Sequence, residues 1–289
     1  MTLKVRVPAS SANLGPGFDS LGLAVSLYLI VEVLGESDKW SVEHDFGKGI
    51  PTDENNLIVH SIIELDKNIT PKKLKVSSNI PLARGLGSSS AAIIAGVMLG
   101  QKLSDKTFSK DELFSVATKI EGHPDNVSPA LFGGLTISWM LDQSPKTLRT
   151  DFLGLDLLAY VPGYELATSK SRSVLPTNVS HAKAVKANSL ANALVASLLL
   201  KDKAKVKELI EADELHEPYR KKLVPELALL RQLGRKQNAW GTYMSGAGPT
   251  VMTLIEKEKQ ADFIKVAKNN GLTGQFLSLQ VDVDGAVFI

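Results

Sequence analysis

The sequence predicts a globular fold that mixes strands and helices, and two kinds of periodicity indicate it. Leu74–Ile80 alternates apolar and polar residues, as a half-buried strand does, and the alternation stops at Pro81. A stripe with helical spacing is formed instead by Leu113, Val116, Ala117 and Ile120. The chain has 289 residues, 44% of them hydrophobic, which suffices for one large domain or two modest ones.

Composition narrows the classes of function. The net charge is +2, from 33 basic and 31 acidic residues, and such a balance does not indicate nucleic acid or an acidic membrane as partner. No cysteine is present, so disulfides, thiolate metal sites and cysteine nucleophiles are excluded. The first residues, MTLKVRVPASS, lack the apolar core of a signal peptide. The longest apolar run, near 191–200, is too short to span a bilayer. We therefore expect a soluble, cytoplasmic protein.

The first predicted elements are two strands with a polar loop between them. Leu3–Val7 alternates and is expected to end at Pro8, and Ala24–Leu34 reads as the second strand. Small and polar residues dominate the loop, which carries Asn13 and Asp19. A loop fixed between two strands holds its side chains near the core, so these two residues are candidates for ligand contacts. An ordinary surface loop would have a similar composition.

A glycine- and serine-rich stretch, PLARGLGSSSAA, follows the strand that ends at Pro81, and we call residues 81–92 the phosphate loop. Ala91–Leu99 then reads as a buried helix. Glycine lets backbone N–H groups approach a ligand, and a helix start leaves N–H groups unpaired beside its positive dipole end. The stretch lacks the Walker A lysine and the third glycine of the dinucleotide fingerprint. A nucleotide phosphate site is one interpretation, and a tight turn with a serine cap is the other.

Two further helices are predicted around this loop. Polar residues 52–56 open a helix over Leu57–Leu65. The capping box Ser109–Glu112 begins the helix that carries the apolar stripe and ends at Glu121. A carboxylate at a helix C-terminus faces the negative end of the dipole, and a bound cation would reverse that penalty. A partly exposed glutamate at a helix end is the alternative.

The segment GHPDNVSPA, residues 122–130, gathers residue types that take part in catalysis. His123, Asp125 and Asn126 lie within four positions beside a helix end. Asp125 or Asn126 could equally cap a short helix through Phe132.

A shift in composition over Asp142–Asp151, after a predicted strand at Leu135–Met140, marks a plausible domain boundary. Leu155–Val161 is almost continuously apolar and reads as a buried strand. Helices are predicted over 182–200 and 203–214, and again up to about Leu233.

Two arginines and a second glycine-rich turn complete the candidates in this half. Arg172 follows a strand exit, and Arg220 belongs to a short interruption, HEPYR, between helices. Taken individually, each arginine is expected to be a solvated residue on the surface. Thr242–Met252 contains SGAGPT between two strand-like runs, which by itself is a hairpin.

Together these segments resemble the GHMP small-molecule kinases. Pro81–Ala92 resembles the phosphate loop of that family, P-x3-G-L-G-S-S-x-A, and SGAGPT at 245–250 resembles its carboxy-terminal glycine motif. PASSANLGPGFDSLG at 8–22 and GHPDNVSPALFGGL at 122–135 are similar to the homoserine kinases of the family in particular. The motifs occur in the family's order and span nearly the whole chain.

The resemblance implies an α+β fold with the two-domain GHMP kinase architecture. Residues 1–150 would form an ATP-binding domain like domain 2 of ribosomal protein S5, and residues 151–289 a ferredoxin-like domain. The active site would lie between them. The family's ATP and Mg²⁺ are expected, a homodimer is implied, and the activity would be phosphorylation of L-homoserine to O-phospho-L-homoserine in threonine biosynthesis.

Roles follow from the resemblance, position by position. Mg²⁺ would be held by Ser89 and Glu121, and catalysis would depend on Asn126 and Glu121. The nucleotide would be bound by Asn56, Leu57, Pro81, Leu82, Ala83, Arg84, Gly85, Leu86, Gly87, Ser88, Ser89, Ser90 and Ala91. Homoserine would be bound by Asn13, Asp19, His123, Asn126, Thr168, Arg172 and Arg220. Arginines suit a carboxylate and Asp19 suits an ammonium group.

Asn126 departs from other members of the family. Counted back from Gly133-Gly134, it stands where mevalonate kinase and galactokinase place a catalytic aspartate. We therefore hypothesise that Asn126 positions the substrate hydroxyl, which attacks the γ-phosphate directly. A GHMP kinase for another alcohol would be expected to have the aspartate and to lack arginines for a carboxylate. An RNA-binding module on an S5-like fold is disfavoured by the near-neutral charge and by the Ser89/Glu121 pair.

Overall fold

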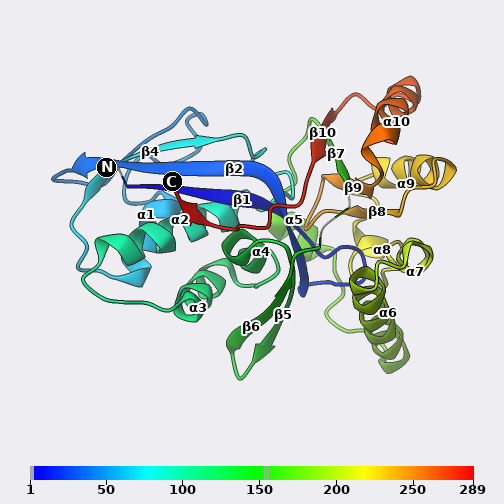
Figure 1. Cartoon of the computed structure of the whole chain (residues 1–289), viewed down its shortest axis with the longest axis horizontal. Coiled ribbons are helices and arrows are strands. Elements are labelled where there is room, and N and C mark those ends of the chain that lie inside the picture. Colours follow the sequence, from blue (N-terminus) through cyan, green and yellow to red (C-terminus); the bar gives the residue numbers. More distant parts are fainter. Residues whose placement is uncertain (1–2, 153, 155) are drawn as a thin grey trace.

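The computed structural model describes residues 3–152, 154 and 156–289. Two sheets lie at opposite ends of the view in Figure 1, and each has its own set of helices. The first sheet is built mainly from the N-terminal half of the chain, and the second from residues 157–279. Helix α5 (Thr168–Ser173) lies where the two halves meet.

The first sheet has a central path of five strands and a hairpin attached to it. The path runs in the order β11 (Val287–Phe288), β1 (Lys4–Ala12), β2 (Leu21–Glu36), β4 (Lys72–Ser78) and β3 (Ser41–Glu43). The hairpin of β5 (Leu135–Leu141) and β6 (Ser144–Thr150) joins β2. Only the β3–β4 pair is parallel among the described strands, so the sheet is predominantly antiparallel.

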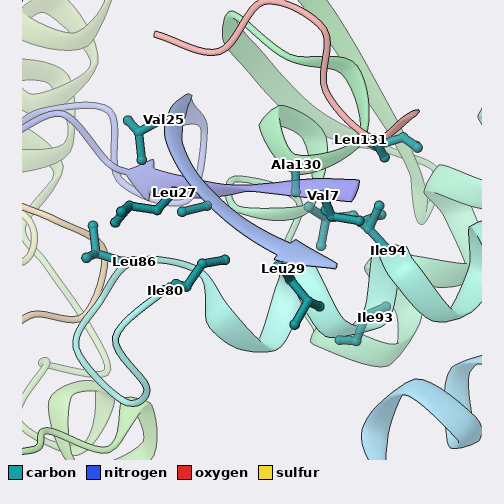
Figure 2. Close-up of a cluster of buried hydrophobic side chains, with 14 of the residues drawn as sticks. Val7, Val25, Leu27, Leu29, Ile80, Leu86, Ile93, Ile94, Ala130 and Leu131 are labelled. Atoms are coloured by element: carbon teal, nitrogen blue, oxygen red, sulfur yellow. The ribbon is translucent and has the colours of Figure 1, made fainter. Parts of the chain in front are cut away.

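Four helices cover this sheet, and their apolar faces form the first core. They are α1 (Leu57–Leu65), α2 (Ser88–Leu103), α3 (Lys110–Glu121) and α4 (Val127–Phe132). Figure 2 shows how Val7 and Leu29 of the strands meet Ile93 and Ile94 of α2, all of them buried. Helix α3 begins with the predicted capping box, in which the Ser109 and Glu112 side chains each accept from the backbone of the other residue. Burial of α2 thus fixes the phosphate loop, which leads directly into it.

The second sheet is antiparallel throughout, in the order β10 (Gln275–Leu279), β7 (Leu157–Val161), β9 (Val251–Leu254) and β8 (Gly241–Met244). The helices of this half are α6 (His181–Leu199), α7 (Lys203–Leu209), α8 (Glu217–Arg220), α9 (Glu226–Lys236) and α10 (Lys257–Asn269). Leu230 of α9 and Phe263 of α10 belong to a second core with Val251 and Leu158 of the sheet. The predicted turn with flanking strands is therefore confirmed as β8–β9.

After β10 the chain returns to the first sheet. Val281 forms a bridge with Val25, and β11 then pairs with β1 at Val5 and Arg6. Both marked ends of the chain therefore lie on the same side of the molecule in Figure 1.

Two predicted boundaries in the first half are wrong. Pro8 does not end the first strand, because β1 continues to Ala12 through a register shift between Pro8 and Ala9. A bulge accommodates the missing N–H of proline. The buried helix begins at Ser88 rather than Ala91, and its N-cap is Gly87 with no side-chain cap. The alternative of a serine cap is therefore wrong.

The segment 142–151 forms the turn of the β5–β6 hairpin and strand β6, and the domain boundary expected there stays a prediction. Three expectations about the second half need correction. The predicted helix 203–214 is shorter and ends as α7 at Leu209, while the HEPYR interruption contains helix α8. Strand β7 begins at Leu157, and Leu155 lies outside the described residues.

None of the helices in the described part of the chain combines the length and the apolar character needed to cross a membrane.

Candidate active site

Two cavities lie next to each other on either side of the phosphate loop. The first, of about 280 Å³, is lined by polar residues of both halves of the chain, among them Asn126 and Arg172, and we call it the polar cavity. The second, of about 320 Å³, is lined by apolar residues such as Phe46 and Ile80, and we call it the apolar cavity. Ala83, Ser88 and Ser89 line both cavities. The phosphate loop therefore forms the boundary between them.

The phosphate loop needs glycine at two positions because its backbone is left-handed there and closely packed. Gly85 has φ +75° and Gly87 has φ +66°. A Cβ on Gly85 would lie 2.5 Å from Ser245 O, and one on Gly87 would lie 2.0 Å from Ser10 Oγ. Only glycine lets this loop pack against β1 and the turn after β8.

Buried hydroxyl groups tie the loop to the second sheet. Ser245 Oγ donates to Gly85 O at 2.6 Å. Ser11 Oγ lies 2.8 Å from Ser245 Oγ and 2.9 Å from Tyr243 OH. Because the proton of Ser245 points to Gly85, Ser11 donates to Ser245 and Tyr243 donates to Ser11. Burial raises the pKa of Tyr243, which keeps it a donor. The loop conformation therefore depends on both halves of the chain.

Glu121, the last residue of α3, faces the first turn of α2. Ser89 Oγ donates to Glu121 Oε2 at 2.9 Å, and Ser90 Oγ donates to Oε1 at 2.8 Å. Mg²⁺ is usually held by one or two carboxylates together with phosphate oxygens, and a hydroxyl and a carboxylate beside a phosphate loop fit that donor set. Among the described residues, no cluster of three or more His, Cys, Asp or Glu side chains could hold a metal alone.

Asn126 precedes α4 and is oriented by β1. Ser10 Oγ donates to Asn126 Oδ1 at 2.9 Å. Asn126 Nδ2 makes one long contact, 3.5 Å from Asp125 Oδ1, and as an amide nitrogen it can only donate to a ligand. Asn126 does not cap α4 through its side chain, so the capping alternative is wrong for this residue.

His123 and Asp125 form a pair beside Asn126. His123 Nδ1 lies 2.6 Å from Asp125 Oδ1, and the Asp125 side chain is almost completely buried. Burial opposes a charged imidazole, but the hydrogen bond and the charge of Asp125 outweigh it, so the pKa of His123 is raised. The carboxylate of Asp125 is thus engaged by a neighbouring side chain.

Arg172 of α5 and Asp19 of the β1–β2 loop are paired across the polar cavity. Arg172 Nη2 lies 2.7 Å from Asp19 Oδ1, and Nη1 lies 3.2 Å from Oδ2. Asn13 Oδ1 accepts from the backbone N of Asp19, and Asn13 Nδ2 donates to Gly246 O. The two charged groups are about one-third exposed, so a ligand can reach them.

Arg220 is buried, with 1% of its surface exposed, and the expectation of a solvated arginine is wrong. Its Nε donates to Ser171 O at 3.1 Å, and its Nη1 donates to Gly246 O at 3.1 Å. Burial and the nearby charge of Arg172 lower the pKa of Arg220 to about 10, so it is charged at neutral pH. Folding brings it to the wall of the polar cavity together with Arg172.

Comparisons with known proteins bear on this arrangement. Residues 56–134 match the GHMP kinases N terminal domain, and residues 194–270 match the GHMP kinases C terminal domain. The homoserine kinase of Streptococcus thermophilus is 48% identical over 286 residues, which cover 99% of each chain. The chain belongs to the GHMP kinase family.

Solved structures agree with this membership. A Listeria monocytogenes structure assigned as a homoserine kinase has 39% identity and a TM-score of 0.89, and the alignment covers 99% of each chain. The homoserine kinase of Cytophaga hutchinsonii has 27% identity and a TM-score of 0.83 over 100% of this chain and 97% of its own. The α+β architecture of GHMP kinases is thereby confirmed, and as a kinase of this family the protein uses ATP.

The GHMP kinase fold brings most of the predicted residues together. The polar cavity is lined by Asn13, Asp19, Ala83, Arg84, Gly85, Gly87, Ser88, Ser89, Glu121, His123, Asn126, Thr168, Arg172 and Arg220. Asn56, Leu57 and Leu82 line the apolar cavity instead. Within the phosphate loop, Leu86, Ser90 and Ala91 are buried, and Pro81 lines neither of the two cavities.

The apolar cavity of this kinase is lined mainly by hydrophobic side chains, with Asn56 on its wall. Asn56 caps α1, because its Oδ1 accepts from Ile58 N at 3.0 Å, and its Nδ2 donates to Pro51 O. Its side chain is thus committed to the fold, and only its backbone is left to approach a base. The phosphate loop continues from this cavity to the polar one.

Sequence reasoning missed three residues that shape the polar cavity of the kinase. Phe18 lies between two guanidinium groups, with its ring centroid 5.7 Å from Arg172 Cζ and 5.3 Å from Arg220 Cζ. Ser10 orients Asn126, and His216 contacts Arg220. Phe18 and Ser10 lie inside the motif at 8–22, and His216 precedes Arg220 by one helical turn. Membership of the motif and the spacing of one helical turn were therefore the signals in the sequence that could have identified these three residues.

Proposed function

We propose that this GHMP kinase phosphorylates the side-chain hydroxyl of L-homoserine with ATP and releases O-phospho-L-homoserine and ADP. Relatives 48% identical over almost the whole chain carry the name homoserine kinase, which supports the proposal. The observation that carries it is the charge pattern of the polar cavity, which Arg172, Arg220 and Asp19 line together with Asn126.

This charge pattern fits a zwitterionic amino acid with a hydroxyl at its far end. The Arg172–Asp19 pair can be exchanged for two ligand contacts, with a carboxylate on Arg172 and an ammonium group on Asp19. Arg220 supplies a second positive charge for the carboxylate. An uncharged alcohol would separate Arg172 from Asp19 without replacing either contact, so the cavity disfavours it.

Phosphoryl transfer from ATP requires positioning and neutralisation of charge more than covalent chemistry. The acceptor oxygen forms a bond to the γ-phosphorus while the bond from that phosphorus to the β–γ bridging oxygen breaks, and ADP leaves with that oxygen. Asn126 Nδ2 donates to the acceptor oxygen and aligns it. Asn126 cannot take the hydroxyl proton, which passes to an oxygen of the transferred phosphoryl group.

The phosphate loop and α2 bind the triphosphate through backbone N–H groups. Ser89 and Glu121 are the residues that would hold Mg²⁺ with the phosphates. When bound, that ion neutralises the phosphate charge that develops during transfer.

An ADP-release assay with Mg-ATP tests the proposed substrate. The panel contains L-homoserine, L-threonine, mevalonate and galactose, and we expect turnover with L-homoserine far above the rest. Activity confined to mevalonate or a sugar, or no activity from protein with a cooperative thermal transition, would remove this proposal. ³¹P NMR of the product distinguishes O-phosphohomoserine from free phosphate.

A second experiment separates Asn126 from Asp125. We expect Asn126→Ala to lower kcat more than it raises the KM for L-homoserine, because the aligned hydroxyl is lost. Asp125→Asn keeps a hydrogen-bonding partner for His123 and removes only the charge. If Asp125→Asn abolished turnover while Asn126→Ala left it unchanged, the catalytic role would pass to Asp125.

We also propose, from the resemblance to the family, that the protein is cytoplasmic and homodimeric and has no nucleic-acid partner. Light scattering across a dilution series and an RNA-binding filter assay test these expectations separately from the activity.

A further inference from the structure

Arg220 contacts a buried histidine, His216, which has no role in the proposed reaction. His216 immediately precedes α8 and has none of its surface exposed. Its Nδ1 lies 3.1 Å from Arg220 Nη1, and its Nε2 lies 3.0 Å from Gly15 O. One ring thus connects the arginine to the β1–β2 loop.

The partners of His216 fix its protonation state. A guanidinium group has only donors, so Nδ1 of the imidazole must accept from Arg220. A carbonyl oxygen has only acceptor capacity, so Nε2 carries the proton and donates to Gly15 O. The ring is therefore neutral, with one tautomer specified by its two contacts.

The neighbours of the ring restrict its movement. The Phe18 ring stacks on it, with centroids 5.2 Å apart and planes inclined by 19°. Asp213 Oδ2 accepts from the backbone N of His216 at 2.8 Å and from that of Glu217 at 2.7 Å, which fixes the chain at this point. The Nε2 atom itself lies 3.6 Å from Asp213 Oδ2. The ring is thus held by the Phe18 stack on one face and by hydrogen bonds at both nitrogens, so it can orient the guanidinium group that it contacts.

The hydrogen bonds of Arg220 determine how its guanidinium group is oriented. Nε donates to Ser171 O, and Nη1 is shared between Gly246 O and His216 Nδ1. Within the described part of the chain, no hydrogen bond engages Nη2. Because the guanidinium group is planar, fixing Nε and Nη1 also fixes Nη2.

We propose that His216 is a positioning residue for the acceptor carboxylate: its neutral Nδ1 holds Arg220 so that Nη2 is presented to that carboxylate in the polar cavity. The proposal rests on the proposed function, since it assumes an acceptor with a carboxylate. It predicts that His216 affects binding of the acceptor and leaves ATP binding unchanged, because the apolar cavity and the phosphate loop make no hydrogen bond with it.

Two matched substitutions separate the contacts of the ring. Asn has its amide oxygen near the position of Nδ1, so His216→Asn keeps the acceptor for Arg220 and loses the contact with Gly15. Gln has its amide near the position of Nε2, so His216→Gln keeps the contact with Gly15 and loses the acceptor for Arg220. Both variants remove the ring from Phe18 equally, which makes each the control for the other.

Steady-state kinetics of the full chain provides the readout. We expect His216→Gln to raise the KM for L-homoserine about tenfold or more, as removal of a charge-assisted hydrogen bond does, while the KM for ATP stays at its wild-type value. His216→Asn is expected to stay within about threefold of the wild type in both constants, because the contact with Arg220 survives. Thermal melts of the two variants measure the stability that each loses.

A double-mutant cycle with Arg220→Met then tests whether His216 acts through Arg220. We expect His216→Gln to lower kcat/KM for L-homoserine in the wild-type background and to have no further effect in the Arg220→Met background. Equal losses in the two backgrounds, or equal KM values for His216→Asn and His216→Gln, would overturn the positioning role. Failure of the wild-type enzyme to phosphorylate L-homoserine would instead overturn the proposed function.

Discussion

The two sides of the phosphate loop are built in opposite ways. On the proposed nucleotide side, one continuous stretch of chain contains the left-handed glycines and the start of α2. On the acceptor side, the charged groups are side chains from four separate segments, namely the β1–β2 loop, the segment before α4, and helices α5 and α8. A triphosphate presents the same oxygens in every kinase, whereas an acceptor must be distinguished from other small molecules.

This difference indicates which substitutions should impair each side of the site. A site made of backbone tolerates changes of side chain except where a Cβ would collide, and the phosphate loop has such positions at Gly85 and Gly87. A site made of side chains can lose one contact at a time, so single substitutions on the acceptor side should alter the KM for one substrate. Substitutions at the junction of the two sides should alter both.

Glu121 belongs to that junction, and its substitution should have the largest effect. Glu121→Gln removes the charge next to Ser89 and is expected to lower kcat on the order of 10²-fold to 10³-fold, as loss of one electrostatic contact to the transition state does. Titration of kcat with Mg²⁺ should show a raised midpoint. Glu112→Gln on the same helix is the control, because Glu112 serves the capping box. Equal activity of the two variants would contradict a role for Glu121 in catalysis.

Gly87→Ala tests whether the nucleotide side depends on backbone shape. The added Cβ would lie 2.0 Å from Ser10 Oγ and 3.1 Å from Asn126 Oδ1, so both the loop and Asn126 must shift. We expect kcat/KM for ATP to fall about tenfold to 100-fold, because a displacement of about 1 Å can cost that much. Gly122→Ala has a similar left-handed φ of +91° but no atom within 4 Å of the added Cβ. We expect Gly122→Ala to lose about 1 kcal/mol of stability and to keep the activity of the wild type.

Arg172→Met tests the independence of the acceptor side. Removal of the guanidinium group leaves Asp19 without its partner and should raise the KM for L-homoserine about tenfold, the loss expected for a charge-assisted hydrogen bond. The KM for ATP should stay unchanged. Lys170→Met, an exposed position on the same helix, controls for the loss of one positive charge. A parallel rise in the KM for ATP would show that the two sides are coupled.

Asp66 lies outside both sides of the site and should affect stability alone. Hydrogen bonds from Ser104 and Lys106 lower the pKa of its carboxyl from 3.8 to about 2. Because the pKa is lower in the folded state, the stabilisation is present above pH 3.8 and is lost as the pH falls towards 2. Asp66→Asn should therefore make the free energy of unfolding fall less steeply between pH 4 and 2. Urea melts across that range measure it, and kcat at neutral pH should not change.

The parts of the fold that local rules decide were predictable from the sequence. The capping box of α3 and the extent of α1 follow from neighbouring residues, and both are confirmed. The phosphate loop was proposed from one stretch because its glycines, its serines and the start of the buried helix are consecutive in the chain. The division of the chain near residue 150 and the role of each site residue stay predictions.

The features of the fold and the site that depend on contacts outside the local segment could not be predicted from the sequence. Arg220 is polar and lies two positions after Pro218, which is typical of a surface turn. Only folding shows that it is buried against Gly246 and Ser171. The continuation of β1 beyond Pro8 depends on pairing with β2 across a bulge. In each case the deciding partner lies outside the local segment, and the periodicity of that segment carries no information about it.

The return of the chain after β10 sets an order for folding during synthesis. Strand β1 precedes its partner β11 in the chain by the whole of the second sheet, so it leaves the ribosome earlier than β11 does. Until β11 emerges, the outer edge of β1 at Val5 and Arg6 has no strand beside it, and such an edge can pair with another chain. The edge of β1 at Val5 and Arg6 is therefore open to pairing with other chains until the second sheet has been synthesised.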